Sequence, residues 1–349
     1  MPPVDMQTVP TVKPIHQHGT RIWLRRALTL IFLGLLIYFF WPLLGEIRAA
    51  AALFRTANWS WLVVALFLQL ISYGFLTWLN ALSLQPFSGK IGFGQLTAVL
   101  TSMAFISIAV PSAGISGVAM RVRLLRKYGY LPEEALFSMV VETVLELIAL
   151  VSVGIVGVAY LVESGRVEGS NVLFLGVIGI ASTATMWAGW ILVRDPVRSR
   201  RIAFKLLSAW NRIGGRFKRF EQDYVDERLT FFQTNLRRYQ SSALWKLPLS
   251  AYGKVFLDVL SLGACFQLFG YSITPSTLFV GYGLVLTFSG MGALPGGLAT
   301  TDAMVPVIFS WLRVPGSFAI AAGLTYRLVA YWLVRFVGYI SWLFLERRR

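Results

Sequence analysis

Charged side chains inside long apolar stretches are the residues of this sequence with the clearest potential for chemistry. Five of them lie in four such stretches: Glu142, Glu146, Asp258, Asp302 and Arg327. A charge at membrane depth is costly, so it faces the protein interior or a water-filled cavity. Glu142 and Glu146 are four residues apart and therefore share one face of a helix. We expect Arg327 to bind a phosphate or an anionic headgroup, and the carboxylates to attract a cationic group or carry protons.

An alternative is that these charges form internal ion pairs that only hold the helices together. Arg327 with Asp302 or Glu142 would be such a pair, and the sequence leaves both interpretations open. We expect two further cations, Lys254 and Arg335, to extend toward the cytoplasmic interface and to have no functional role.

Proline and glycine interrupt two other apolar stretches. They are Pro111, Gly114 and Gly117 in residues 91–120, and Pro295, Gly296 and Gly297 in residues 278–311. These residues free backbone groups that lipid cannot satisfy, so the breaks must face protein, water or a polar ligand. Secondary transporters bind their substrates at opposed half-helix ends of this kind. The alternative is that the small residues only allow close helix packing.

The composition is that of a membrane protein. The chain has 349 residues, of which 56% are hydrophobic and 14% charged, and a formal net charge of +16. A soluble domain cannot bury so much apolar side chain. The basic residues lie in short segments between apolar runs, which favours the anionic cytoplasmic leaflet and membrane lipids as partners and not nucleic acid.

The sequence contains no recognisable motif for binding a metal ion or a nucleotide. The chain has one cysteine, Cys265 in an apolar run, and two histidines, His16 and His18 in a polar tail. P-loop, H-E-x-x-H and G-x-S-x-G patterns do not occur. We expect no metal, no cofactor and no enzymatic activity.

Six apolar runs are long enough to cross about 30 Å of hydrocarbon. They are Ala27–Leu44, Trp59–Leu82, Leu136–Leu161, Val172–Val193, Leu247–Phe269 and Phe318–Phe344. Basic segments mark the cytoplasmic side by the positive-inside rule. These segments are the tail 1–26, the stretch with Arg121, Arg123, Arg126 and Lys127, the loop 194–246, and the C-terminal arginines.

The charges predict a single membrane domain, residues 27–345, with both termini in the cytoplasm and the chain in the cell membrane. Residues 91–120 must enter and leave on the cytoplasmic face, and residues 278–311 on the outer face. The predicted fold is an all-α integral membrane protein with about six full transmembrane helices and two re-entrant hairpins related as an inverted repeat. Within the basic loop, residues 200–210 are typical of an amphipathic helix on the membrane surface.

The second break resembles a signature of the lysylphosphatidylglycerol synthase membrane-region family, also called flippase-like proteins. Residues 295–302 are similar to its P-G-G-x-G-x-x-E pattern, with Ala299 for a glycine and Asp302 for the glutamate. The first break followed by Glu142 resembles the first signature, and Arg327 stands where the family has an arginine. The similarity covers residues 25–345.

The resemblance implies a lipid translocase, without the aminoacyltransferase half that the multiple peptide resistance factors carry. Its substrate would be a polar-headed lipid that contains phosphate, such as an aminoacyl-phosphatidylglycerol, or a glycolipid. A separate lipid synthase or glycosyltransferase would then be the partner. Two alternatives remain: a gradient-coupled transporter of a small solute, and a membrane-embedded enzyme that modifies lipids.

Overall fold

In the computed structural model, the regular secondary structure of the described residues is entirely helical. The described residues are 43–110, 115–163, 200–202, 204–205, 208, 222–239, 241–291 and 298–347. The chain divides into two units, residues 1–47 and 48–349, and helix α2 (Leu43–Leu53) begins in the first of them. The site lies in the second unit, and the rest of the description concerns that unit.

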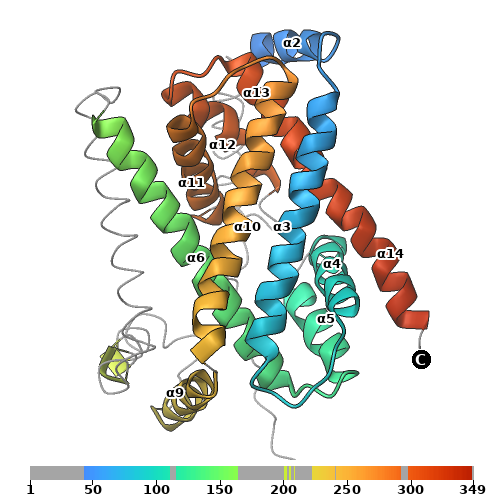
Figure 1. Cartoon of the computed structure of the whole chain (residues 1–349), viewed down its shortest axis with the longest axis vertical. Coiled ribbons are helices and arrows are strands. Elements are labelled where there is room, and N and C mark those ends of the chain that lie inside the picture. The colour runs from blue at the N-terminus through green and yellow to red at the C-terminus, as the bar shows by residue number, and fades with distance from the viewer. Residues whose placement is uncertain are drawn as a thin grey trace, which may run out of the picture. The chain divides into compact units, whose positions relative to one another are not determined.

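Ten α-helices and one π-helical turn follow α2 in the described part of this unit (Figure 1). They are α3 (Ser60–Leu84), α4 (Phe93–Ala109), α5 (Ile115–Arg126), α6 (Pro132–Glu163), α9 (Gln222–Arg237), α10 (Ser241–Leu268), α11 (Pro275–Met291), α12 (Leu298–Trp311), α13 (Gly316–Arg327), η2 (Leu328–Trp332) and α14 (Leu333–Arg347). No strand occurs among these described residues.

Four of the described helical segments are long and apolar enough to cross a membrane. They are Ser60–Leu84, Pro132–Val153, Trp245–Leu268 and Gly316–Glu346. These segments confirm four of the six predicted spans and the prediction of an all-α integral membrane protein. The other two, 27–44 and 172–193, fall wholly or almost wholly outside the described residues.

The first residues of α6 show why a helix begins there. Pro132 occupies the first helical position, where its missing N–H costs nothing. Glu134 Oε2 accepts a hydrogen bond from the backbone N–H of Leu131 at 2.8 Å. The negative charge of Glu133 and Glu134 also favours the positive end of the helix dipole.

Helices α3 and α10 lie side by side at the centre of Figure 1. A Cβ atom at Gly253 would lie 2.4 Å from the ring of Phe75, so the glycine allows this close approach. Ser261 Oγ donates to the carbonyl oxygen of Ala65 at 3.1 Å across the same interface. Small and hydroxyl side chains of this kind are typical of helix contacts within membranes.

The first predicted break is where α4 ends and α5 begins. Val110 has extended backbone angles, and the next described residue is Ile115, the first of α5. Ser116 Oγ lies 3.2 Å from the carbonyl oxygens of both Ile106 and Val110, so it can donate to backbone acceptors at the helix end. Gly117 packs against α4, because a Cβ there would lie 1.9 Å from Ser107 Oγ.

The second predicted break separates α11 from α12. Pro295, Gly296 and Gly297 lie outside the described residues, as do Pro111 and Gly114 of the first break. In Figure 1 the pair α4–α5 lies beside the lower part of α3, and the pair α11–α12 beside the upper part of α10. The inverted repeat and the two membrane faces stay predictions.

The basic loop also contains helical structure. The described residues between 200 and 208 are helical, as predicted, and α9 follows them. Arg200 forms an ion pair with Asp226 of α9.

Candidate functional site

Three groups of polar side chains lie within the long helices of the second unit. The Arg121 cluster consists of Asn80, Arg121, Ser138 and Glu142. The Lys254 cluster consists of Gln69, Ser72, Glu146, Lys254, Asp258 and Tyr282. The Tyr331 cluster consists of Arg327, Tyr331 and Arg335.

Arg121 is the largest of the fully buried side chains among the described residues, at 1% exposure. Its Nη1 atom donates to Glu142 Oε2 at 2.7 Å, and its Nη2 atom donates to Ser138 Oγ at 3.0 Å and to Asn80 Oδ1. The cluster is therefore neutral and ties α5 to α3 and α6. Such a buried pair is costly to break, since either partner alone would be a buried charge.

The sequence analysis missed this role for Arg121 and counted it only among the cytoplasmic basic residues. A signal was present, because Arg121 follows Gly117 by four residues and so shares its buried face of α5. Glu142, which we considered as a partner of Arg327, forms an ion pair with Arg121.

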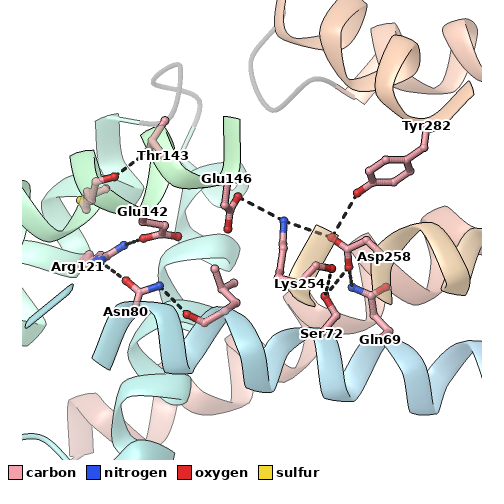
Figure 2. A network of polar contacts seen from close by, with 12 residues as sticks. Gln69, Ser72, Asn80, Arg121, Glu142, Thr143, Glu146, Lys254, Asp258 and Tyr282 are labelled. Carbon is pink, nitrogen blue, oxygen red and sulfur yellow. Dashed lines mark hydrogen bonds and ion pairs between the residues drawn. The ribbon is translucent and has the colours of Figure 1, made fainter. Parts of the chain in front are cut away.

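Lys254 of α10 lies between two carboxylates, as Figure 2 shows. Its Nζ atom is 3.3 Å from Glu146 Oε2 of α6 and 3.2 Å from Asp258 Oδ2. The expectation that Lys254 extends toward the interface is therefore wrong. An ammonium group finds stronger stabilisation between two carboxylates than at a distant headgroup layer.

Asp258 is the carboxylate of the Lys254 cluster with more hydrogen-bond donors around it. It accepts hydrogen bonds from Gln69 Nε2 at 3.1 Å, Ser72 Oγ at 2.5 Å and the Tyr282 hydroxyl at 3.3 Å. Helices α3 and α11 supply these donors, so the cluster joins α3, α6, α10 and α11 (Figure 2).

The Tyr331 cluster lies where the last long helix changes its hydrogen-bond pattern. Residues Leu328–Trp332 form a π-helical turn, a feature often found at functional sites. The guanidinium carbons of Arg327 and Arg335 lie 4.2 Å and 3.2 Å from the centre of the Tyr331 ring. Arg335 Nη1 donates to the carbonyl oxygen of Tyr331 at 3.0 Å.

Arg335 therefore folds back onto its own helix and does not extend to the interface, contrary to our expectation. Its guanidinium gains more from the electron-rich ring face and a backbone carbonyl within reach. The Arg335 Nε atom and the Tyr331 hydroxyl are buried, and neither has a hydrogen-bond partner in the described chain.

The other predicted site residues are less informative. Asp302 belongs to α12, but its side chain lies outside the described part of the structure. Gly117 allows the contact between α5 and α4, which favours the packing interpretation at that position. Within the described residues, no group of three or more His, Cys, Asp or Glu side chains is arranged to hold a metal ion.

One buried tyrosine outside the spanning helices completes the electrostatic description. The Tyr239 hydroxyl, between α9 and α10, donates to the carbonyl oxygen of Ser83 at 2.8 Å. Burial raises the pKa of Tyr239 above the ordinary value. This tyrosine fastens the basic loop to the end of α3 and lies apart from the three clusters.

Known proteins resemble this chain along most of its length. A UPF0104 membrane protein of Methanocaldococcus jannaschii is 21% identical over 298 residues, which cover 83% of this chain and 86% of the relative. A UPF0104 membrane protein of Methanothermobacter thermautotrophicus is 24% identical over 308 residues, covering 84% and 87%. The family model described as lysylphosphatidylglycerol synthase TM region matches residues 22–338. With that match spanning both helix pairs and all three clusters, the chain belongs to the lysylphosphatidylglycerol synthase TM region family.

Proposed function

We propose that this protein is a lipid translocase that moves a phosphate-bearing lipid between the two leaflets. The Tyr331 cluster is the observation that carries the proposal. Two guanidinium groups lie on one tyrosine ring inside a helix long enough to span the membrane. A cationic site at that depth suits an anionic headgroup that must leave water during translocation.

Arg335 gives the strongest chemical support. Within the described residues no carboxylate lies at ion-pair distance from Arg335, and its Nε atom has no acceptor. A guanidinium group binds phosphate with two parallel hydrogen bonds, and Nε with one Nη atom forms such a pair. The Tyr331 hydroxyl, which also has no partner among the described residues, adds a neutral donor beside it.

The family supports the lipid class. Its description names lysylphosphatidylglycerol, whose headgroup combines a phosphate with a cationic amine. An aminoacyl-phosphatidylglycerol or a glycolipid with a phosphate would match the cationic Tyr331 cluster and the carboxylates of the Lys254 cluster. A separate lipid synthase or glycosyltransferase would supply such a lipid, and this chain itself would have no enzymatic activity.

The proposed topology follows from charge and from the two broken helix pairs. Both termini would lie in the cytoplasm and the chain in the cell membrane. The pairs α4–α5 and α11–α12 would enter from opposite faces as halves of an inverted repeat, which is a frequent plan for alternating access.

Leaflet exchange in proteoliposomes tests the function. The panel contains labelled phosphatidylglycerol, its aminoacylated form, a polyprenyl-phosphate sugar, and a glycosyl diacylglycerol without phosphate as the matched control. We expect at least one phosphate-bearing lipid to exchange while the phosphate-free control does not. Equal exchange of all four lipids would contradict a phosphate-selective site.

A gradient-coupled carrier of a small solute is the second candidate, and the Lys254 cluster favours it. Buried carboxylates between spanning helices are also found in carriers that bind soluble cations or protons. Gradient-dependent solute uptake in the same vesicles, without movement of any lipid, would replace the translocase by this carrier.

A further inference from the structure

The Lys254 cluster has one more acid than base. Glu146 and Asp258 share the single ammonium group of Lys254, at 3.3 Å and 3.2 Å. With all three groups ionised the cluster carries one net negative charge between spanning helices. An unbalanced charge in such a place is expensive, and one bound proton would remove it.

We propose that Glu146 is a proton-binding site, and that its proton couples the lipid movement proposed above to a proton gradient. The coupling rests on the proposed function, whereas the proton site does not. The reaction is simple: a proton adds to one oxygen of the Glu146 carboxylate, and the net charge of the Lys254 cluster changes from −1 to zero.

The hydrogen bonds identify which carboxylate takes the proton. Asp258 accepts three hydrogen bonds from neutral donors in addition to its contact with Lys254, and this arrangement stabilises its ionised form. Glu146 has the Lys254 contact at Oε2, while its Oε1 atom is buried and has no donor within the described chain. A buried carboxylate oxygen without a donor favours the protonated form.

The cluster is also short of hydrogen-bond donors. Gln69 is 6% exposed, and its Nε2 atom donates to Asp258. Its Oε1 atom is a second buried acceptor for which the described part of the chain supplies no donor. Buried acceptors without donors each cost free energy. One additional proton would neutralise the excess negative charge of the cluster and would also supply a hydrogen-bond donor.

Several charged and titratable groups surround Glu146, and protonation of Glu146 would change the electrostatic potential at these groups. The charged and titratable groups around the cluster are Tyr73 of α3, Glu142 of α6, Lys254 and Asp258 of α10, Tyr282 of α11, Tyr326 of α13 and Arg335 of α14. Arg121 balances Glu142.

A proton on Glu146 would change the contact between α6 and α10. When Glu146 is ionised, it holds Lys254 and ties α6 to α10. When Glu146 is protonated, the ion pair between Lys254 and Asp258 within α10 remains. The ion pair between Lys254 and Glu146 is lost, which weakens the contact between α10 and α6.

Infrared difference spectroscopy tests the proton site without any transport assay. We expect a pH titration of the purified protein in nanodiscs to show the carbonyl stretch of a protonated carboxyl group, and Glu146→Gln to abolish that band. Asp258→Asn should also abolish it at the same pH, because Lys254 then belongs to Glu146 alone. Glu227→Gln, an exposed position on α9, is the matched control and should keep the band.

The gradient response tests the coupling. In proteoliposomes with an imposed pH gradient, we expect lipid exchange to depend on the gradient in the wild type, and Glu146→Gln to lose that dependence. A carboxyl band that persists in Glu146→Gln would overturn the proton site. Lipid exchange that ignores the gradient in the wild type would overturn the coupling but leave the translocase, whereas a titrating band without any lipid exchange would leave the proton site and remove the translocase.

Discussion

Glu142 and Glu146 stand one turn apart on α6, yet their surroundings differ (Figure 2). Glu142 has a cation of its own, Arg121, whose other amino group is held by Asn80 and Ser138. Glu146 shares Lys254 with Asp258, and its second oxygen has no donor in the described chain. One cluster is neutral and joined by direct hydrogen bonds, whereas the other holds a surplus charge.

The difference shows that depth in the membrane does not by itself make a charge functional. A balanced pair such as Arg121–Glu142 fixes the position of three helices, and its charges already compensate each other. The Lys254 cluster can change its charge by binding one proton. Charge balance therefore distinguishes the structural cluster from the one that we propose to be functional.

Removing the cation of the structural cluster should have the largest effect. Arg121→Met leaves Glu142 buried and uncompensated, which we expect to lower the free energy of unfolding by about 3–5 kcal/mol. Thermal or denaturant unfolding in a defined detergent measures it. The matched control is Arg123→Met, since Arg123 is 62% exposed and its pair with Glu346 is 3.5 Å long; its cost should be at most about 1 kcal/mol. Equal costs at 121 and 123 would contradict the structural role.

The two glutamates can then be compared directly by the same amide substitution. Glu142→Gln should cost about 1.5–3 kcal/mol, because it replaces a hydrogen bond between charged groups. Glu146→Gln should cost clearly less, since it removes the surplus charge of the Lys254 cluster. Unfolding under identical conditions measures both, and a larger loss for Glu146→Gln would reverse our assignment of the two clusters.

The structural cluster can also be disturbed through backbone packing, without a change in charge. Gly117→Ala places a Cβ 1.9 Å from Ser107 Oγ and 3.0 Å from the carbonyl oxygen of Met103. We expect α5 to shift and the protein to lose about 1–3 kcal/mol of stability. Gly74→Ala is the control, because no atom of the described residues lies within 4 Å of a Cβ there. A loss of stability in Gly74→Ala as large as in Gly117→Ala would argue against tight packing of α5.

A neutral hydrogen bond outside both clusters should show the smallest effect. Tyr239→Phe removes the bond to the Ser83 carbonyl and should cost about 0.5–1.5 kcal/mol at neutral pH. Because burial raises the pKa of Tyr239, the unfolded chain releases this proton first, and the wild type should lose stability as pH rises above about 10. The variant should lack this part of the decline. An unchanged pH profile would contradict the burial.

The sequence was sufficient to predict the membrane-spanning helices, but not which side chains contact one another between them. Apolar length predicted four spans that the structure describes, and proline with glycine placed a break between α4 and α5. The same reasoning located Glu142, Glu146 and Asp258 at depth, because a charge in an apolar run is visible as such.

The errors concern the direction of side chains between helices. Position along a span suggested that Lys254 and Arg335 extend to the interface, whereas the choice depends on which carboxylate or ring the neighbouring turn presents. Arg121 belongs to a basic segment by sequence, yet the packing of α5 against α3 and α6 turns it inward. Such pairings arise from tertiary contacts between residues as far apart as 80 and 121, which periodicity does not report.

The most direct test of the central claim is the initial rate of phosphatidylglycerol exchange in proteoliposomes that contain wild type or Arg335→Gln, at equal amounts of folded protein. We predict a fall of about 10- to 100-fold, since a hydrogen bond between charged groups is worth about 1.5–3 kcal/mol. Arg126→Gln, exposed on α5, serves as the control and should exchange like wild type. Equal rates for wild type and Arg335→Gln would contradict a phosphate site at the Tyr331 cluster.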